Sequence, residues 1–144
     1  MGITLSDEAM RVVQAFEDLS GVAARDCVVR ADRVLLVVAP EDMGLAIGRD
    51  GETVRAFEDR MGTAVRVVAD ADWPEDFVAN ALAPAAVYDV EIEDGVATVS
   101  VAPEDRGVAI GEGGSRIEDA TVLAARHTGV EEIRLEEEPR NGDA

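Results

Sequence analysis

The stretch Ala39-Pro-Glu-Asp-Met-Gly-Leu-Ala-Ile-Gly48 returns further along the chain as Ala102-Pro-Glu-Asp-Arg-Gly-Val-Ala-Ile-Gly111, with eight of its ten residues unchanged. A second glycine follows each copy after three residues, at Gly51 and Gly114. A single Gly-x-x-Gly would predict little, but a repeat of this length is hard to obtain by chance. The chain is therefore a tandem of two related units, each with Ile-Gly-x-x-Gly at a turn between two helices.

The Gly-x-x-Gly turn is suited to holding the backbone of a nucleic acid. Glycine lets the chain leave one helix and enter the next without a Cβ clash, so that backbone N–H groups face outward. The following helix begins with unpaired N–H groups and a positive partial charge, and both favour a phosphate. An apolar groove beside such a turn holds about four nucleotides of single-stranded RNA.

Each half of the chain follows one order of elements: helix, strand, strand, short helix, turn, helix, strand. Apolar periodicity and β-branched runs predict helices at residues 4–19, 42–47 and 52–60, with strands at 27–30, 34–38 and 64–68. In the second half they predict helices at 75–82, 105–110 and 115–127, with strands at 86–92, 96–101 and 130–135. Each unit is thus α+β, with a three-stranded sheet and helices on one face.

The domain organisation follows from the repeat and from a break between its copies. Asp70-Ala-Asp-Trp-Pro74 interrupts the pattern of elements and is the expected junction. We expect a first domain at residues 1–70, a second at 71–138, and an acidic flexible tail at 139–144.

The charge balance is strongly acidic. Asp and Glu together number 31 and Lys and Arg 13, which gives a net charge of −18, and every basic residue is arginine. One interpretation is a protein that avoids nucleic acid. The interpretation we favour is adaptation to a salt-rich cytoplasm, because the acid is spread over the whole chain and the apolar side chains are small. High salt then screens the mutual repulsion.

Other classes of function find little support. The sequence has one histidine, His127, and one cysteine, Cys27, so it predicts neither a zinc site nor a disulfide. It has no lysine for a phosphate-binding Walker motif. The paired acids Glu41-Asp42 and Glu104-Asp105 are better explained as helix caps than as acid–base or metal sites. We expect no enzyme, catalytic residue, metal or cofactor, no membrane span or signal peptide, and a cytoplasmic monomer.

The order of elements resembles a known family. Helix, Gly-x-x-Gly and helix after a β-hairpin resemble a KH domain, and the leading helix and closing strand resemble its type II, prokaryotic form. Two such domains in tandem are similar to the NusA family, above all its archaeal members, here of haloarchaeal character. The resemblance rests on Phe16-Glu-Asp-Leu-Ser-Gly21, Asp26-Cys27, Gly44-Leu-Ala-Ile-Gly-Arg-Asp-Gly-Glu52, Ala83-Pro-Ala85 and Gly107-Val-Ala-Ile-Gly-Glu-Gly-Gly-Ser-Arg-Ile117. It implies binding of single-stranded RNA, RNA polymerase as a partner, and a role in transcription elongation and termination on nascent RNA.

The residues expected to bind RNA lie at the two turns and at the start of the helix after each. In the first unit they are Ile47, Gly48, Arg49, Asp50, Gly51, Glu52 and Arg55, and in the second Ile110, Gly111, Glu112, Gly113, Gly114, Ser115 and Arg116. Arg55 and Arg116 are either cation contacts for phosphates or residues of a solvated face. The second turn carries Glu112 and no cation between its glycines, so the second unit is either a weaker binder or a scaffold.

Two alternatives to a transcription factor stay open. One is an RNA-binding protein of ribosome biogenesis or RNA processing, where KH folds also occur. The other is a protein–protein adaptor that kept the fold and lost RNA binding, which would explain the carboxylates Asp50 and Glu112 inside the turns.

Overall fold

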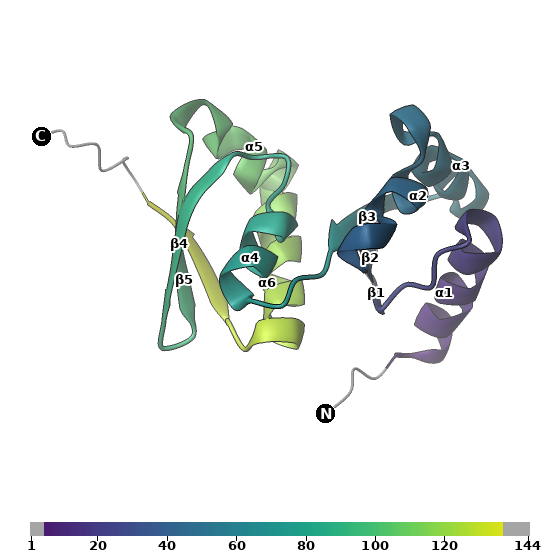
Figure 1. Cartoon of the computed structure of the whole chain (residues 1–144), viewed down its shortest axis with the longest axis horizontal. Helices are drawn as coiled ribbons and strands as arrows, with labels where there is room; N and C mark the ends of the chain where they lie inside the picture. Colours follow the sequence, from purple (N-terminus) through teal and green to yellow (C-terminus); the bar gives the residue numbers. More distant parts are fainter. Residues whose placement is uncertain (1–4, 137–144) are drawn as a thin grey trace, which may run out of the picture. The chain divides into compact units, whose positions relative to one another are not determined.

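A computed structural model describes residues 5–136 of the chain (Figure 1). The chain divides into two compact units, Met1–Asp70 and Ala71–Ala144. The two units repeat one order of elements, as the sequence predicts. The acidic tail expected at 139–144 lies outside the described residues. The first helix, expected to start at residue 4, begins at Asp7 with Ser6 as its N-cap.

The first unit begins with a helix and a hairpin and continues through the turn to a third strand. Its elements are α1 (Asp7–Ser20), β1 (Asp26–Val29), β2 (Arg33–Val38), the 3-10 turn η1 (Pro40–Asp42), α2 (Met43–Ile47), the 3-10 turn η2 (Arg49–Gly51), α3 (Glu52–Met61) and β3 (Ala64–Ala69).

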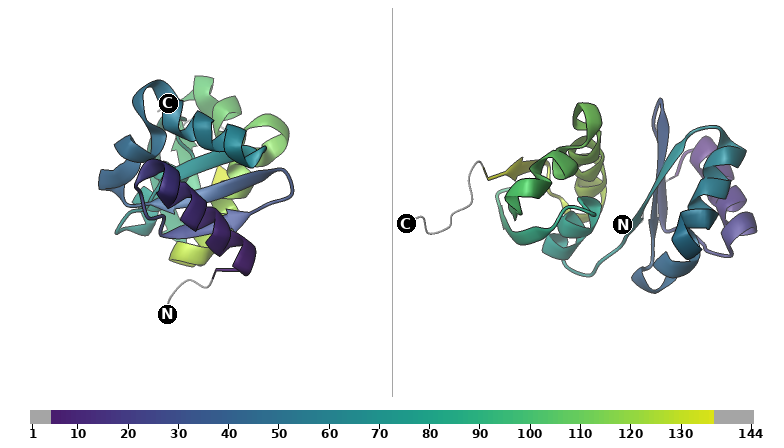
Figure 2. Two further views of the ribbon diagram at one scale, coloured as in Figure 1. Left: turned by 90° about the vertical axis from the view of Figure 1, so that its right-hand side faces the viewer. Right: turned by 90° about the horizontal axis from the view of Figure 1, so that it is seen from above.

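Strand β2 is the centre of the first sheet. It pairs antiparallel with β1 and parallel with β3. The parallel pairing is possible because α2, η2 and α3 carry the chain back to the same end of the sheet. Helices α1 and α3 lie on one face of the sheet (Figure 2), and there Phe16 and Phe57 meet edge to face with ring centroids 5.1 Å apart. These rings belong to the core of the unit, together with Val34, Leu36 and Val38 of β2.

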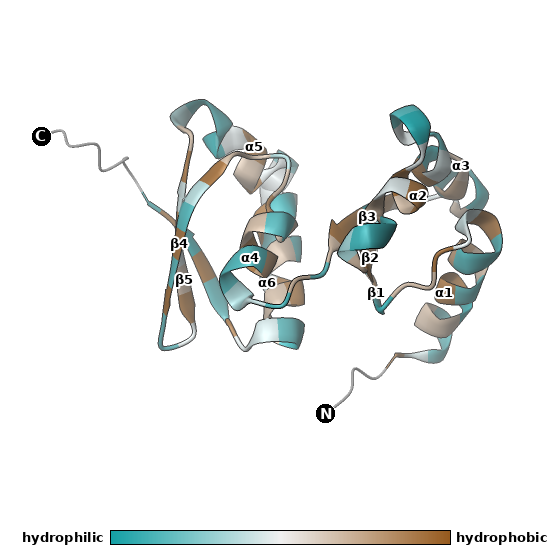
Figure 3. Ribbon diagram, viewed as in Figure 1, coloured by the Kyte–Doolittle hydropathy of each residue, from teal (hydrophilic) through white to brown (hydrophobic). Residues whose placement is uncertain are grey.

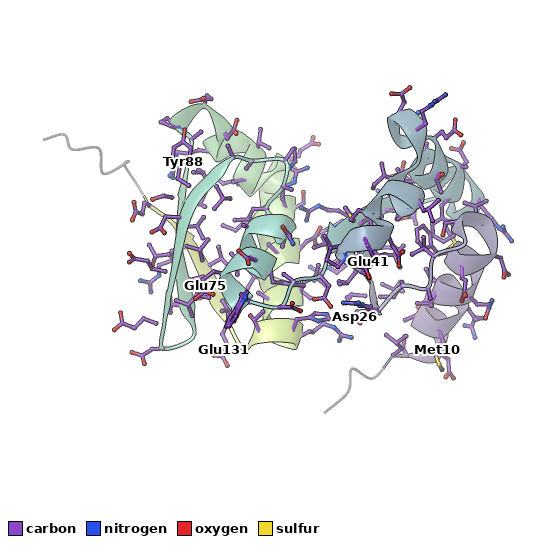
Figure 4. The ribbon with its side chains drawn as sticks, in the orientation of Figure 1. Met10, Asp26, Glu41, Glu75, Tyr88 and Glu131 are labelled. Atoms are coloured by element: carbon purple, nitrogen blue, oxygen red, sulfur yellow. The ribbon has the colours of Figure 1, made fainter. Side chains whose placement is uncertain are left out.

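The start of β1 places a carboxylate inside the first unit. Asp26, labelled in Figure 4, is fully buried and accepts a hydrogen bond of 2.8 Å from the backbone N–H of Cys27. Cys27 is buried and, as the single cysteine of the sequence, forms no disulfide within the chain. Next to it, Arg25 forms an ion pair of 2.9 Å with Asp70 at the end of the unit. The hydrogen bond that Arg25 donates to the carboxylate of Asp70 raises the pKa of the Arg25 guanidinium.

The second unit repeats this plan on a sheet of order β4-β5-β6. Its elements are α4 (Pro74–Ala81), β4 (Val87–Glu93), β5 (Val96–Val101), the 3-10 turn η3 (Pro103–Asp105), α5 (Arg106–Ile110), the 3-10 turn η4 (Glu112–Gly114), α6 (Ser115–Thr128) and β6 (Glu132–Leu135). The hairpin turns at Asp94-Gly95, where both residues have positive φ, which is the geometry that such a pair favours between antiparallel strands.

The second unit differs from the first in two details that the sequence does not reveal. The register of β4 against β5 shifts between Val87 and Asp89, so Tyr88 is the extra residue of a bulge and is exposed (Figure 4). His127, in the last turn of α6, stacks on Phe77 of α4 with ring centroids 5.0 Å apart. His127 therefore packs as an aromatic ring in the second unit.

The acidic pairs before the short helices are not helix caps, and this prediction is wrong. Asp42 has helical dihedral angles and makes no side-chain capping hydrogen bond to α2. Asp105 likewise does not cap α5; its carboxylate instead accepts a hydrogen bond of 2.8 Å from the N–H of Ala86. The reason is that Pro40 and Pro103 start a 3-10 turn ahead of each short helix, so the acids already lie inside helical backbone.

Candidate nucleic-acid interface

The first Gly-x-x-Gly turn is built from three departures from helical geometry within four residues. Gly48 has φ 81° and ψ 169°, which ends α2, and Asp50 and Gly51 then take left-handed conformations with φ 54° and 78°. Backbone hydrogen bonds hold the turn: the N–H of Gly48 donates to the carbonyl of Gly44 at 2.8 Å, that of Gly51 to the carbonyl of Gly48 at 3.0 Å, and that of Glu52 to the carbonyl of Arg49. The turn is hydrophilic (Figure 3).

The second turn has the same backbone. Gly111 has φ 81° and ψ 168°, and Gly113 and Gly114 follow with φ 63° and 80°. The same backbone hydrogen bonds recur, from Gly111 to Gly107 at 2.9 Å, from Gly114 to Gly111 at 3.0 Å, and from the N–H of Ser115 to the carbonyl of Glu112. The sequence repeat is therefore a repeat of local geometry, and any difference between the turns comes from their side chains.

The first glycine of each turn is required by the helix that follows it. A Cβ on Gly48 would lie 2.7 Å from the backbone nitrogen of Thr53, and one on Gly111 would lie 2.6 Å from the backbone nitrogen of Arg116. These distances are far shorter than a carbon and a nitrogen tolerate. This agrees with the expectation that glycine avoids a Cβ clash where the chain passes from one helix to the next, because the close neighbour at Gly48 and Gly111 is the protein itself.

The last glycine of each turn faces open space. A Cβ on Gly51 would meet only the guanidinium of Arg55, with its Nη1 atom at 2.8 Å, and one on Gly114 would meet nothing within 4 Å. Arginine is flexible enough to move away from such a contact. Gly51 and Gly114 therefore mark the side on which a ligand could approach the backbone.

The helices after the turns start without a side-chain cap. Gly51 and Gly114 occupy the N-cap positions of α3 and α6, and neither helix has a capping hydrogen bond from a side chain. Helix α1 is the contrast, because the hydroxyl of Ser6 accepts a hydrogen bond of 3.0 Å from the N–H of Ala9. First-turn N–H groups without such an acceptor, at the positive end of a helix, favour an anionic ligand.

The charged side chains differ between the turns. Arg49, Asp50, Glu52 and Arg55 are all exposed in the first unit. In the second, Glu112 is exposed and Ser115 is half-buried at the first position of α6. These residues gather at the turns as the sequence predicts.

Arg116 does not take the place expected of a phosphate contact. One guanidinium nitrogen, Nη1, donates a hydrogen bond of 2.5 Å to the carbonyl oxygen of Val108 in α5. Its Nε atom is buried and has no hydrogen-bond partner among the described residues. The side chain thus folds back across the turn onto the preceding helix.

An apolar surface borders each turn. Ile47 is half-buried, and Ile110 exposes 37% of its surface. Sequence reasoning missed their neighbours Leu45 and Val108, which expose 62% and 36%. The available signal was Ala46 and Ala109, small residues that occupy the buried position of each short helix and leave the large aliphatic residues on either side facing outward.

The described part of the chain contains neither a cluster of metal ligands nor a helix that could span a membrane. Residues 5–136 contain no group of three or more His, Cys, Asp or Glu side chains placed to hold a metal ion. No helix among them is long and apolar enough to cross a membrane.

The order of elements, the mixed three-stranded sheets and the paired Gly-x-x-Gly turns define a tandem KH protein. Within the second unit, the family model for the NusA-like second KH domain matches residues 74–140. A crystal structure of the protein APE1850 is similar over 92% of this chain and 100% of its own, with a TM-score of 0.78 and 26% sequence identity.

The chain is also similar to named archaeal proteins. The chain is 48% identical over 138 residues to the "Probable transcription termination protein NusA" of Halococcus morrhuae, covering 94% of this chain and 99% of the relative. It is 31% identical over 137 residues to the protein of the same name from Methanocaldococcus jannaschii, covering 92% and 75%. The chain therefore belongs to the NusA family, in its archaeal form. The family consists of transcription factors and not of enzymes, in agreement with the sequence.

Proposed function

We propose that the chain binds single-stranded RNA at its first Gly-x-x-Gly turn and acts on nascent RNA in transcription elongation and termination. The observation that carries the proposal is the start of α3, where Gly51 is open to solvent and no side chain caps the helix. Membership of the NusA family supports the role in transcription, since the relatives are named as termination proteins.

The turn offers an RNA two kinds of contact. A phosphate fits at the first turn of α3, where N–H groups and the helix dipole favour negative charge and the exposed Arg49 and Arg55 add cations. The exposed aliphatic Leu45 and the half-buried Ile47 lie on α2, immediately before the turn, where they offer apolar surface to unstacked bases. This combination suits a single strand, because a duplex hides its base faces.

The carboxylates near the turn limit long-range attraction. Asp50 and Glu52 are exposed beside the same helix start, and each repels a phosphate by about 1 kcal/mol at 4 Å in bulk water. Salt removes most of this repulsion, because the Debye length is about 3 Å at 1 M. Binding then rests on short-range hydrogen bonds and apolar contacts.

Membership of the NusA family supports the choice of a protein partner. We propose RNA polymerase as the partner, with the chain acting as a cytoplasmic monomer on RNA that emerges from the enzyme. Copurification with polymerase subunits supports this assignment, whereas copurification with pre-ribosomal particles favours a role in ribosome biogenesis.

The alternative is an adaptor without RNA binding. The observation in its favour is the acidic character of the second turn, where Glu112 replaces the arginine of the first, in a chain with net charge −18. It predicts that the folded protein has no affinity for RNA at any salt concentration.

A titration with labelled RNA distinguishes an RNA-binding protein from an adaptor that does not bind RNA. We would follow the anisotropy of a fluorescein-labelled single strand of randomised sequence in about 2 M KCl. The strand is about 12 nucleotides long, well above the roughly four that one KH groove holds. Binding of this strand in preference to a duplex of the same length supports the proposal. A folded protein, as judged by circular dichroism, that binds neither would overturn it.

The position of the site is tested by Gly51→Asp. The carboxylate stands where we place the phosphate, so affinity should fall by about tenfold or more. Gly62→Asp is the matched control: Gly62 ends the same helix, has a similar φ of 72°, and also has open space around it. Equal losses of RNA affinity in the two variants would show that the binding site does not lie at the turn.

A further inference from the structure

The two turns share a backbone but place their arginines differently. Thr53 and Arg116 occupy the same position, the second residue of the helix after the turn, and the backbone of each closes on the first glycine. In the first unit this position is a threonine, and the arginines lie at Arg49 and Arg55, both exposed. In the second unit the only arginine from Gly111 to the first turns of α6 is Arg116.

Arg116 is committed to an internal contact. Its guanidinium donates to the carbonyl of Val108 in α5, which ends at Ile110. The last carbonyls of a helix have no partner within the helix, and an arginine that bonds to one of them acts as a C-terminal cap. The adjacent Nε atom is buried, and the Cβ of Arg116 lies 2.8 Å from the place a Cβ would take on Gly111. The inner part of the side chain is thus packed against the turn, and a hydrogen bond holds its guanidinium on the preceding helix.

Apart from Arg116, the charged side chains around the second turn are negative. Glu112 stands at the place of Arg49, and Glu118 stands at the place of Arg55. In the first unit the guanidinium of Arg55 reaches back beside Gly51, at the open side of the turn. The corresponding open side at Gly114 has no such cation next to it, because a Cβ there would meet no atom within 4 Å.

We infer that Arg116 is a structural cap of α5 and that the RNA backbone is held by the first turn alone. The inference rests on the proposed RNA binding and assigns unequal roles to two turns that the sequence repeat makes look equivalent. The second unit then contributes to the protein through its fold and other surfaces, and its Gly-x-x-Gly turn makes no phosphate contact.

Matched glycine variants test the inequality. Gly51→Asp and Gly114→Asp place the same carboxylate at equivalent positions, with φ of 78° and 80°. In the RNA titration described above, we expect Gly51→Asp to lose about tenfold or more and Gly114→Asp to stay within about twofold of wild type. Equal losses overturn the inference and leave RNA binding intact. No loss in Gly51→Asp, or no binding by the wild type, instead overturns the proposed function.

Arginine variants test the role of Arg116 itself. Arg116→Thr copies the residue of the first unit, and we expect it to lower the unfolding temperature while RNA affinity stays within about twofold. Arg55→Thr is the matched control, expected to weaken RNA binding several-fold and leave the unfolding temperature unchanged, because its side chain is exposed. A loss of affinity in folded Arg116→Thr as large as that in Arg55→Thr would show that Arg116 binds phosphate, and the inference would fail.

Discussion

At the scale of single residues, the two glycines of one motif have different reasons to be there. Gly48 is held against the backbone nitrogen of Thr53, whereas Gly51 faces solvent with only the mobile end of Arg55 nearby. The first glycine is a requirement of folding, and the second leaves room for a ligand. Substitutions at the two positions should therefore separate stability from binding.

We predict that Gly48→Ala destabilises the protein much more than Gly51→Ala. Both positions have positive φ, which costs an alanine about 1–2 kcal/mol. Gly48→Ala adds a clash with Thr53 and should bring the total to about 3 kcal/mol or more. Urea unfolding in molar KCl measures both variants. Equal losses would mean that the turn relaxes around the new methyl group.

The sequence predicts where the site lies but not how each side chain is used. The repeated Gly-x-x-Gly motif is sufficient to locate both turns, because the motif determines the backbone conformation locally. Arg116 shows the limit: its partner is the carbonyl of Val108, eight residues back across the turn, and that contact depends on how α5 and α6 pack. Leu45 was missed for a similar reason, since its exposure depends on which side of α2 meets the sheet.

At the scale of elements, the helices differ in how they begin. Helix α1 has a hydroxyl cap from Ser6, whereas α3 and α6 begin at glycines with no side-chain cap. A side-chain cap would occupy the N–H groups that we propose for the phosphate. The absence of a cap at α3 is therefore consistent with a binding role, at some loss of helix stability.

We predict that Ser6→Ala lowers the free energy of unfolding by about 1 kcal/mol. RNA affinity should not change, because α1 lies outside the proposed site. Ser6→Asp is the control, since an aspartate also accepts the hydrogen bond from Ala9 and should keep stability close to wild type. Thermal unfolding in molar KCl measures both; a stable Ser6→Ala would show that this cap contributes little.

Most helices and strands could be predicted from the sequence, and the predictions that failed have local causes. Runs such as Val34–Val38 predict strands because β-branched residues favour them, and the predicted helices and strands appear in the predicted order. The prediction that Asp42 and Asp105 cap helices was wrong because a proline starts a 3-10 turn two residues earlier in each case. The bulge at Tyr88 depends on register between strands, which the pattern of one strand does not encode.

At the scale of the whole molecule, we expect the net charge of −18 to oppose both folding and RNA binding. Carboxylates spread along the chain repel one another and also repel RNA. Salt screens both effects, so the same change of conditions should favour the folded state and the complex.

We predict that the unfolding temperature rises with KCl and that RNA affinity rises or stays constant from about 0.2 M to about 2 M KCl. A basic RNA-binding protein behaves in the opposite way, because it gains affinity by releasing counterions from phosphates. The fraction folded must be measured at each salt concentration, so that refolding is not counted as binding. A steep fall in affinity while the protein stays folded would show that Arg49 and Arg55 dominate through their charge.

The most direct test of the account is an NMR titration of the protein with single-stranded RNA in molar KCl. We predict that the backbone amide signals of residues 49–55, and those of Leu45 and Ile47 in α2, shift most on binding. The amides of residues 112–118 around the second turn should move little. Shifts concentrated away from the first turn, or no shifts at all in the folded protein, would contradict the claim that this turn holds the RNA.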